Sequence, residues 1–142
     1  MIEFDYAQPG AYFITICTYR RRQLFGRVRQ RHIEVNWIGR IVREEWWRTE
    51  AIRKNILLDQ FVVMPNHFHA ILHITHSIEN KNTVRAHCNA PLHRPAKSVS
   101  STIGLFKGSV TRKARMKLGD PSFNVWQRNY YEHIIRNDHE LN

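Results

Sequence analysis

The chain has 142 residues, with 22 Lys and Arg against 12 Asp and Glu, so its formal net charge at pH 7 is +10. Hydrophobic residues make up 42% of the chain, which suffices for one modest core and argues against disorder. No run of about 18 uncharged apolar residues occurs, so a membrane span is excluded. Neither a signal peptide nor a disulfide framework is visible, so we expect a cytoplasmic protein with reduced thiols.

Positive charge is concentrated in two stretches, which makes a polyanion the expected partner. Six arginines fall within residues 20–31, and residues 97–119 hold six Lys and Arg but no acidic residue. Lys and Arg side chains that neutralise phosphates release counterions, and so give affinity without reading sequence. We therefore expect nucleic acid as the partner. The alternative is a solvated basic surface that only keeps the protein soluble.

Side-chain periodicity predicts four elements in the first half of the chain. Residues 11–20 are rich in aromatic and β-branched side chains and indicate a strand, followed by a basic, irregular connection at 21–31. Residues 32–54 carry apolar side chains at helical spacing and indicate an amphipathic helix. Residues 56–64 and 67–75 read as strands joined by a two-residue Pro-Asn turn, which predicts a hairpin.

The second half predicts a loop, a helix and a fourth strand. Residues 76–96 show little periodicity and indicate a long loop, whereas residues 98–118 resume helical spacing. After a Gly-Asp-Pro break, residues 123–135 read as a strand, and residues 137–141 look like the capped start of a further helix. The order along the chain is therefore β-α-β-β-α-β with a trailing helix start.

Two glycines, Gly104 and Gly108, interrupt the second predicted helix. Each weakens a helix by about 1 kcal/mol relative to Ala. Close approach of another backbone or of a ligand would explain why the helix keeps them.

The element order predicts an α+β fold for residues 1–142, as a single domain. A ferredoxin-like βαββαβ sandwich satisfies it, with one antiparallel sheet and both helices on one face. The sequence shows no internal repeat at the periods of solenoid proteins.

The strand predicted at 67–75 carries three histidines on one face. Residues two apart in a strand point the same way, so His67, His69 and His73 share a face, and the alternate, apolar residues should face the helices. Two neighbouring imidazoles on an open sheet face can converge on one divalent cation. The candidate metal ligands are therefore His67 and His69.

Other interpretations of the histidines stay open. A His-x-His pattern arises by chance in a chain with nine histidines, and strand histidines are often half-buried packing residues. A zinc cage would need ligands from the long loop, but their spacing fits no standard template. Those residues are His76, His87, Cys88 and His93.

The motif VMPNHFHAIL at 63–72 resembles the His-hydrophobic-His signature of HUH nucleases. The residues of this motif are similar to those of the single-tyrosine transposases of insertion sequences, and most of all to those of the REP-associated tyrosine transposases. Further segments match that family in order along nearly the whole chain. They are YFITICT at 12–18, LFG at 24–26, SVSSTIGLFK at 98–107 and WQRNYYEHIIR at 126–136. The family fold is the same ferredoxin-like sandwich.

The resemblance implies cleavage and rejoining of single-stranded DNA next to a hairpin. In the family, a tyrosine attacks the phosphodiester and forms a 5′-phosphotyrosine, while a divalent metal, Mg²⁺ or Mn²⁺, polarises the scissile phosphate. By resemblance, His67 and His69 are the catalytic metal ligands. Some relatives work as dimers and others as monomers, so a homodimer stays open.

The resemblance also raises the question of the nucleophile. The family's tyrosine lies on the helix after the fourth strand, so here it is expected beyond Asn142, and the sequence would be a truncated catalytic domain. Tyr130 and Tyr131 are the alternatives. Adjacent strand residues point to opposite faces, so at most one of them faces the histidines. We expect the inward one to belong to the core and the outward one to pack or stack on DNA.

Basic residues near the histidines are the candidates for contacts with DNA phosphates. They are Arg20, Arg21 and Arg22 at the end of the first strand, and Lys107, Arg112 and Arg115 on the second helix. Two further hypotheses compete with a DNA nickase and transposase. One is a non-catalytic nucleic-acid-binding module of ferredoxin-like fold, and the other is a basic structural domain with incidental histidines.

Overall fold

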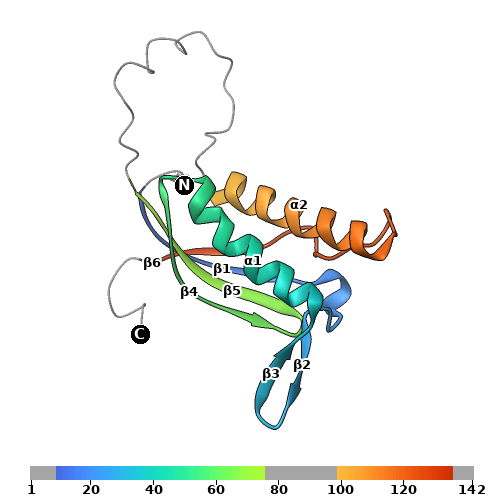
Figure 1. The fold of residues 1–142 in the computed structure, drawn as a ribbon. Helices are drawn as coiled ribbons and strands as arrows, with labels where there is room; N and C mark the ends of the chain where they lie inside the picture. The colour runs from blue at the N-terminus through green and yellow to red at the C-terminus, as the bar shows by residue number, and fades with distance from the viewer. Residues whose placement is uncertain (1–8, 76–98, 136–142) are drawn as a thin grey trace.

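The computed structural model describes residues 9–75 and 99–135, which form two helices packed on one face of a four-stranded antiparallel sheet (Figure 1). The elements of this sandwich are β1 (Gly10–Cys17), α1 (Trp37–Ile52), β4 (Ile56–Met64), β5 (His67–Ile74), α2 (Val99–Leu118) and β6 (Tyr131–Ile135). The strands run in the order β4-β5-β1-β6 across the sheet. The predicted α+β ferredoxin-like βαββαβ sandwich is therefore confirmed.

The core lies between the helices and one face of the sheet. Trp46 of α1 stands at its centre, edge-on to Phe68 of β5 and to Phe106 of α2, with ring centroids 5.1 and 5.0 Å away. All three side chains are almost fully buried, and burial of each stabilises the fold by about 1.5–3 kcal/mol. In the part of the chain that the structure describes, no helix covers the other face of the sheet.

A two-stranded hairpin that projects from the body of the molecule replaces the irregular connection predicted at 21–31 (Figure 1). Its strands are β2 (Gly26–Arg29) and β3 (His32–Val35), joined by Gln30 and Arg31, whose φ angles are +50° and +64°. Two central residues with positive φ match the twist of antiparallel strands. The prediction was wrong because neither turn residue is the Gly or Asn that usually marks such a turn.

Helix α1 begins at Trp37, and not at residue 32 as predicted, because Asn36 caps it. The side-chain oxygen of Asn36 accepts a hydrogen bond from the backbone N–H of Gly39 at 3.0 Å. Its amide donates to the carbonyl of Leu24 at 2.8 Å. Asn is among the best capping residues, so one side chain ends the hairpin and starts the helix.

Strand β1 ends at Cys17, and not at residue 20 as predicted, because the chain turns sharply there. Tyr19–Arg21 form a 3₁₀ turn whose two arginines both have a φ of +53°, a left-handed conformation that is uncommon for residues with a side chain. The fully buried Thr18 holds this turn. Its hydroxyl donates to the carbonyl of Arg22 at 2.7 Å, and its N–H donates to the carbonyl of Asn66 at 3.0 Å.

The fourth strand is confirmed only over its last part, because β6 begins at Tyr131. Within the predicted range 123–135, the earlier residues run irregularly beside the end of β1, where the N–H of Gln127 donates to the carbonyl of Cys17 at 2.9 Å. Val125 and Trp126 are both buried, so the alternation of a strand is broken there.

The loop predicted at 76–96 and the helix start predicted at 137–141 lie outside the described residues. The four residues weighed as a zinc cage lie outside them as well. Over residues 9–75 and 99–135, none of the helices has the length and apolar character that a membrane crossing requires.

The glycines of the two helices differ in their surroundings. A Cβ on Gly39 of α1 would overlap the carbonyl oxygen of Phe25 and the side chain of Val35. A Cβ on Gly104 or Gly108 of α2 would meet nothing within 4 Å among the described atoms. Within residues 9–75 and 99–135, no backbone therefore approaches α2 closely at these glycines, and the ligand alternative is taken up below.

We predict that Gly39→Ala lowers the free energy of unfolding by about 1–3 kcal/mol, because the added methyl overpacks a closed contact. Gly104→Ala is the matched control, and should raise the free energy of unfolding by up to about 1 kcal/mol because Ala is the better helix former. Urea denaturation followed by circular dichroism measures both changes. Changes of the same sign in the two variants would contradict this account of the glycines.

Candidate functional site

Two histidines stand side by side on the open face of the sheet. His67 and His69 are both half-buried on β5, while the residue between them points into the core. Their ring centroids lie 4.5 Å apart, with the ring planes at 74°. The structure thus brings the predicted pair together. His73 shares their face, but its Nε2 lies 2.9 Å from a carboxylate oxygen of Asp59 on β4.

Each ring of the pair is held through its Nδ1 atom. The Nδ1 of His67 lies 2.7 Å from the side-chain oxygen of Asn66, and the Nδ1 of His69 lies 2.8 Å from the hydroxyl of Thr15. The ring of Phe13 also stacks on His69, with centroids 5.5 Å apart. Because an amide oxygen only accepts, the His67 Nδ1 donates, and Nε2 keeps the lone pair that a metal needs.

The surroundings keep both imidazoles in the form that binds metals. Burial lowers the pKa of His67, and the positive charge of Arg21 lowers it further. Burial also lowers the pKa of His69, with an added contribution from His67. A histidine whose pKa lies below its ordinary value of about 6.5 is neutral at pH 7. The pair therefore fits a divalent cation by charge state as well as by position.

Three neighbours of the pair were missed from the sequence. Thr15 and Cys17 lie on β1, directly opposite His69 and His67 in the antiparallel register. Asn66 was interpreted only as a turn residue. The contacts of the two β1 residues depend on strand pairing across some fifty positions of the chain, so no local pattern could reveal them.

The two candidate tyrosines lie on opposite sides of the sheet. Tyr131 pairs with Thr15 and is 60% exposed on the histidine face, so β1 separates it from the histidines on β5. Tyr130 packs partly against the core, and its hydroxyl donates to a carboxylate oxygen of Glu132 at 3.1 Å.

The three consecutive arginines lie in the turn that follows β1, and all three are exposed. Arg21 is near enough to His67 for its charge to act on that ring. The guanidinium of Arg20 lies over the ring of Tyr19, 5.2 Å from its centroid. The end of β1 therefore carries exposed positive charge beside the histidine pair.

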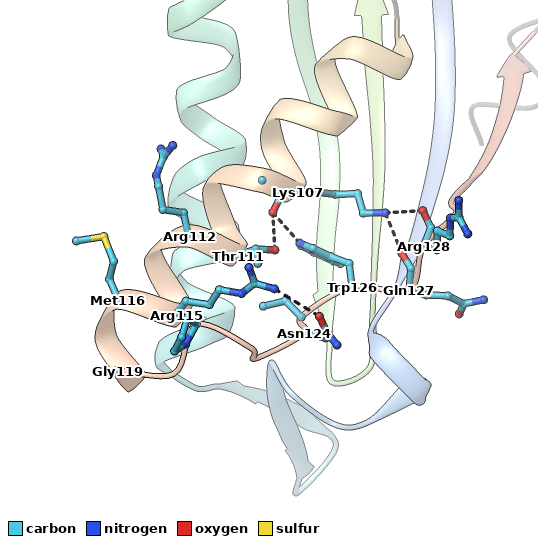
Figure 2. Close-up of a pocket in the computed structure, with 13 residues that line it drawn as sticks. Lys107, Thr111, Arg112, Arg115, Met116, Gly119, Asn124, Trp126, Gln127 and Arg128 are labelled. Atoms are coloured by element: carbon cyan, nitrogen blue, oxygen red, sulfur yellow. Dashed lines mark hydrogen bonds between the residues drawn. The ribbon is translucent and has the colours of Figure 1, made fainter.

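The cations of α2 do not share the histidine face, because α2 belongs to the layer that covers the opposite face of the sheet. Lys107, Arg112 and Arg115 line a pocket of about 750 Å³ between α2 and residues 119–128 (Figure 2). The expectation that they lie beside the histidines is therefore wrong. The sequence shows which residues of α2 are basic, but the packing of the helix against the core decides which way they point.

Solved structures define the class of this fold. A REP-associated tyrosine transposase bound to a REP hairpin has a TM-score of 0.61 and 22% identity, over 99% of this chain and 66% of that one. A candidate transposase from Deinococcus radiodurans R1 has a TM-score of 0.52 and 18% identity, over 99% and 89% of the two chains. The fold is transposase-like, and the resemblance to the tyrosine transposases is confirmed at that level. The chain spans just under two thirds of the REP-associated transposase.

An uncharacterized protein of Haemophilus influenzae is 38% identical to this chain over 144 residues, which cover 95% of this chain and 76% of that protein. The chain belongs to the same family as this Haemophilus influenzae protein. No family model matches the sequence.

We predict that Arg21→Ala raises the pKa of His67, because it removes a charge that repels the protonated ring. Burial still holds that pKa below its ordinary value. Arg22→Ala, one residue further on, is the control and should leave the pKa unchanged. Proton NMR of the ring signals, with a chelator present, measures the shift. Equal shifts in both variants would contradict the specific placement of Arg21.

The lowered pKa values of His67 and His69 also predict how the free energy of unfolding changes with pH. Both folded pKa values lie below about 6.5, so the unfolded chain binds protons more readily than the folded chain as the pH falls through that value. The contribution of His67 and His69 to the free energy of unfolding is therefore fully present above about pH 6.5 and is lost as the pH falls through their folded pKa values. Arg21→Ala should make this loss in acid smaller.

Proposed function

We propose that this chain is the DNA-binding and metal-binding domain of an HUH-type single-tyrosine transposase, which acts on single-stranded DNA carrying a hairpin. The observation that carries the proposal is the fixed pair of neutral imidazoles, His67 and His69, on the open face of a strongly basic protein. The transposase-like fold supports it. The REP hairpin bound to one of the solved structures supports DNA as the ligand.

The Nε2 atoms of His67 and His69 would hold a divalent ion, Mg²⁺ or Mn²⁺. Such an ion supplies Lewis-acid stabilisation of the charge that develops on a phosphate. Asn66 and Thr15 contribute by holding the rings through Nδ1, as partners of metal-binding histidines commonly do. Among the residues that the structure describes, no group of three or more His, Cys, Asp or Glu gathers at one point, so these two imidazoles are the protein ligands on offer there.

The arginine turn would position the DNA backbone beside the histidines. Arg20, Arg21 and Arg22 are exposed, and Arg21 acts on His67 through its charge. Guanidinium groups bind phosphate oxygens in a bidentate manner and fix the register of a strand. The metal-binding face would therefore meet a phosphate that is already anchored.

A tyrosine hydroxyl would be the nucleophile. Its attack on phosphorus forms the 5′-phosphotyrosine bond and releases the 3′-hydroxyl, and the reverse step rejoins the strand without outside energy. In the family this tyrosine lies on the helix after the fourth strand, and the corresponding position here is expected beyond Asn142, since residues 132–142 contain no tyrosine. Tyr131 faces the open side but lies two strands from the histidines, and we assign it to stacking on a base.

A second candidate is a DNA-binding module without catalysis. It is favoured by the position of Tyr131, which is separated from β5 by the whole of β1. It shares the fold, the charge and the DNA ligand with the first candidate, and differs only in forming no covalent link.

We predict that His67→Ala and His69→Ala each weaken Mn²⁺ binding more than about tenfold, because each removes one ligand of the pair. His73→Ala is the matched control, since this histidine shares the strand and the face but contacts Asp59 instead. Isothermal titration calorimetry measures the three affinities. If His73→Ala lost as much affinity as the other two, the metal site would be elsewhere.

We expect no covalent protein–DNA adduct from residues 1–142, because residues 132–142 contain no tyrosine and Tyr131 is not the assigned nucleophile. A chain extended beyond Asn142 to include the family's tyrosine should form an adduct that survives denaturation when it is incubated with a labelled hairpin DNA and Mn²⁺. In the extended chain the adduct should vanish in His67→Ala and persist in Tyr131→Phe, because Tyr131 is not the assigned nucleophile. Gel electrophoresis under denaturing conditions shows both results. DNA binding by the extended chain without an adduct would establish the non-catalytic module. An adduct from residues 1–142 that is lost in Tyr131→Phe would make that residue the nucleophile.

A further inference from the structure

The pocket beneath α2 is a second candidate ligand site, separate from the histidine face. It has a volume of about 750 Å³ and lies between α2 and the segment 119–128 that leads to β6 (Figure 2). Four of the residues that line it are cationic, and none is acidic. The four cations are Lys107, Arg112, Arg115 and Arg128. In a site of this composition, an anion is the favoured occupant.

Two of the four cations are anchored yet retain hydrogen-bonding capacity. The Nζ of Lys107 donates to the carbonyls of Gln127 and Arg128 at 2.9 and 3.3 Å. An ammonium group has three N–H donors, so one remains for a ligand. The Nε of Arg115 donates to the carbonyl of Phe123 at 2.8 Å and one Nη donates to the side-chain oxygen of Asn124 at 3.4 Å, which leaves the remaining guanidinium N–H groups for a ligand. Both groups are therefore held in place before a ligand arrives.

The other two cations, Arg112 and Arg128, are exposed and lie on opposite sides of the pocket in Figure 2. No ion pair joins either of them to another residue in the described ranges. Arginines of this kind are suited to phosphate oxygens. The rim of the pocket thus presents positive charge that nothing described neutralises.

The floor of the pocket is apolar, which distinguishes it from a simple anion site. Val125 and Trp126 are almost fully buried, and the indole N–H of Trp126 donates to the carbonyl of Lys107 at 3.2 Å. Gly108 contributes no side chain, and a Cβ there would meet nothing within 4 Å among the described atoms. The resulting space is larger than a phosphate needs and suits a flat, largely apolar group beside a phosphate.

The pocket and the histidine face share one structural support. The N–H of Gln127, which lines the pocket, donates to the carbonyl of Cys17, and Cys17 stands opposite His67 in the register of the sheet. The pocket therefore adjoins the end of β1, whose Cys17 is the neighbour of His67 in the sheet. An acidic peptide would also suit the charge, but nothing described links a peptide to this edge.

We propose that this pocket binds one unpaired nucleotide of single-stranded DNA, with the base over the apolar floor and the phosphates on either side of it beside Arg112 and Arg128 of the rim. That the nucleotide belongs to the strand held at the histidines rests on the proposed function. Occupation of the pocket itself requires neither metal nor cleavage. A bound nucleotide would then explain why the helix has a glycine at position 108, as the sequence leads us to expect of a ligand.

The test compares two variants of the same helix, Gly108→Glu and Gly104→Glu. Both add one negative charge at an exposed, open helix position, but only Gly108 lines the pocket. The probes are a labelled oligo-dT of about ten nucleotides and an abasic deoxyribose-phosphate chain of the same length, measured by fluorescence anisotropy with a chelator present. Wild type should bind oligo-dT on the order of tenfold more tightly than the abasic chain.

Gly108→Glu should abolish this preference for bases, whereas Gly104→Glu should keep it, and circular dichroism confirms that both fold. A second pair tests the rim: Arg112→Ala with Arg128→Ala should weaken oligo-dT binding more than Arg40→Ala with Lys54→Ala, which removes the same charge elsewhere. The proposal is overturned if wild type shows no preference, if Gly108→Glu retains it, or if the two double variants lose affinity equally.

These outcomes are separable from those of the proposed function. If Mn²⁺ binding does not depend on His67 but the base preference depends on Gly108, the metal proposal fails and the pocket stands. If Mn²⁺ binding depends on His67 and no base preference exists, the pocket proposal fails alone.

Discussion

The pleat of strand β5 is the constraint on which the rest of the structure depends. Burial of Phe68 and Leu72 against the helices fixes one face of the strand, and the period of two then directs His67 and His69 to the other. A shift of one residue in register would place imidazoles in the core and phenyl rings in water. The hydrophobic effect on one face therefore decides where the imidazole nitrogens of the other face point.

The elements with a strong and sustained period could be predicted from the sequence. Strand β5 and helix α2 match their predicted ranges to within a residue, because several side chains in each repeat the same burial. Strand β4 also matches its predicted range, although a register shift between Leu58 and Phe61 interrupts its alternation. The failures have local causes. One capping side chain, Asn36, moved the start of α1, and two residues with positive φ, Gln30 and Arg31, made a hairpin without the usual turn residues.

Only the part of the candidate site that lies within a single strand could be predicted from the sequence. The shared face of His67 and His69 follows from their spacing, but the hydroxyl that holds His69 comes from Thr15, and the strand register alone brings it there. The cations of α2 show the same limit. Packing of Phe106 against Trp46 sets the rotation of that helix, and Lys107 is thereby turned toward the segment 119–128.

Thr18 links the arginine turn to the histidine pair through hydrogen bonds. Its buried backbone and hydroxyl join the arginine turn to the carbonyl of Asn66, and the side chain of Asn66 steers the ring of His67. The turn and the ring are thus mechanically coupled through two short links. The position of the arginine turn and the orientation of the His67 ring therefore depend on the same hydrogen-bonded links, through Thr18 and Asn66.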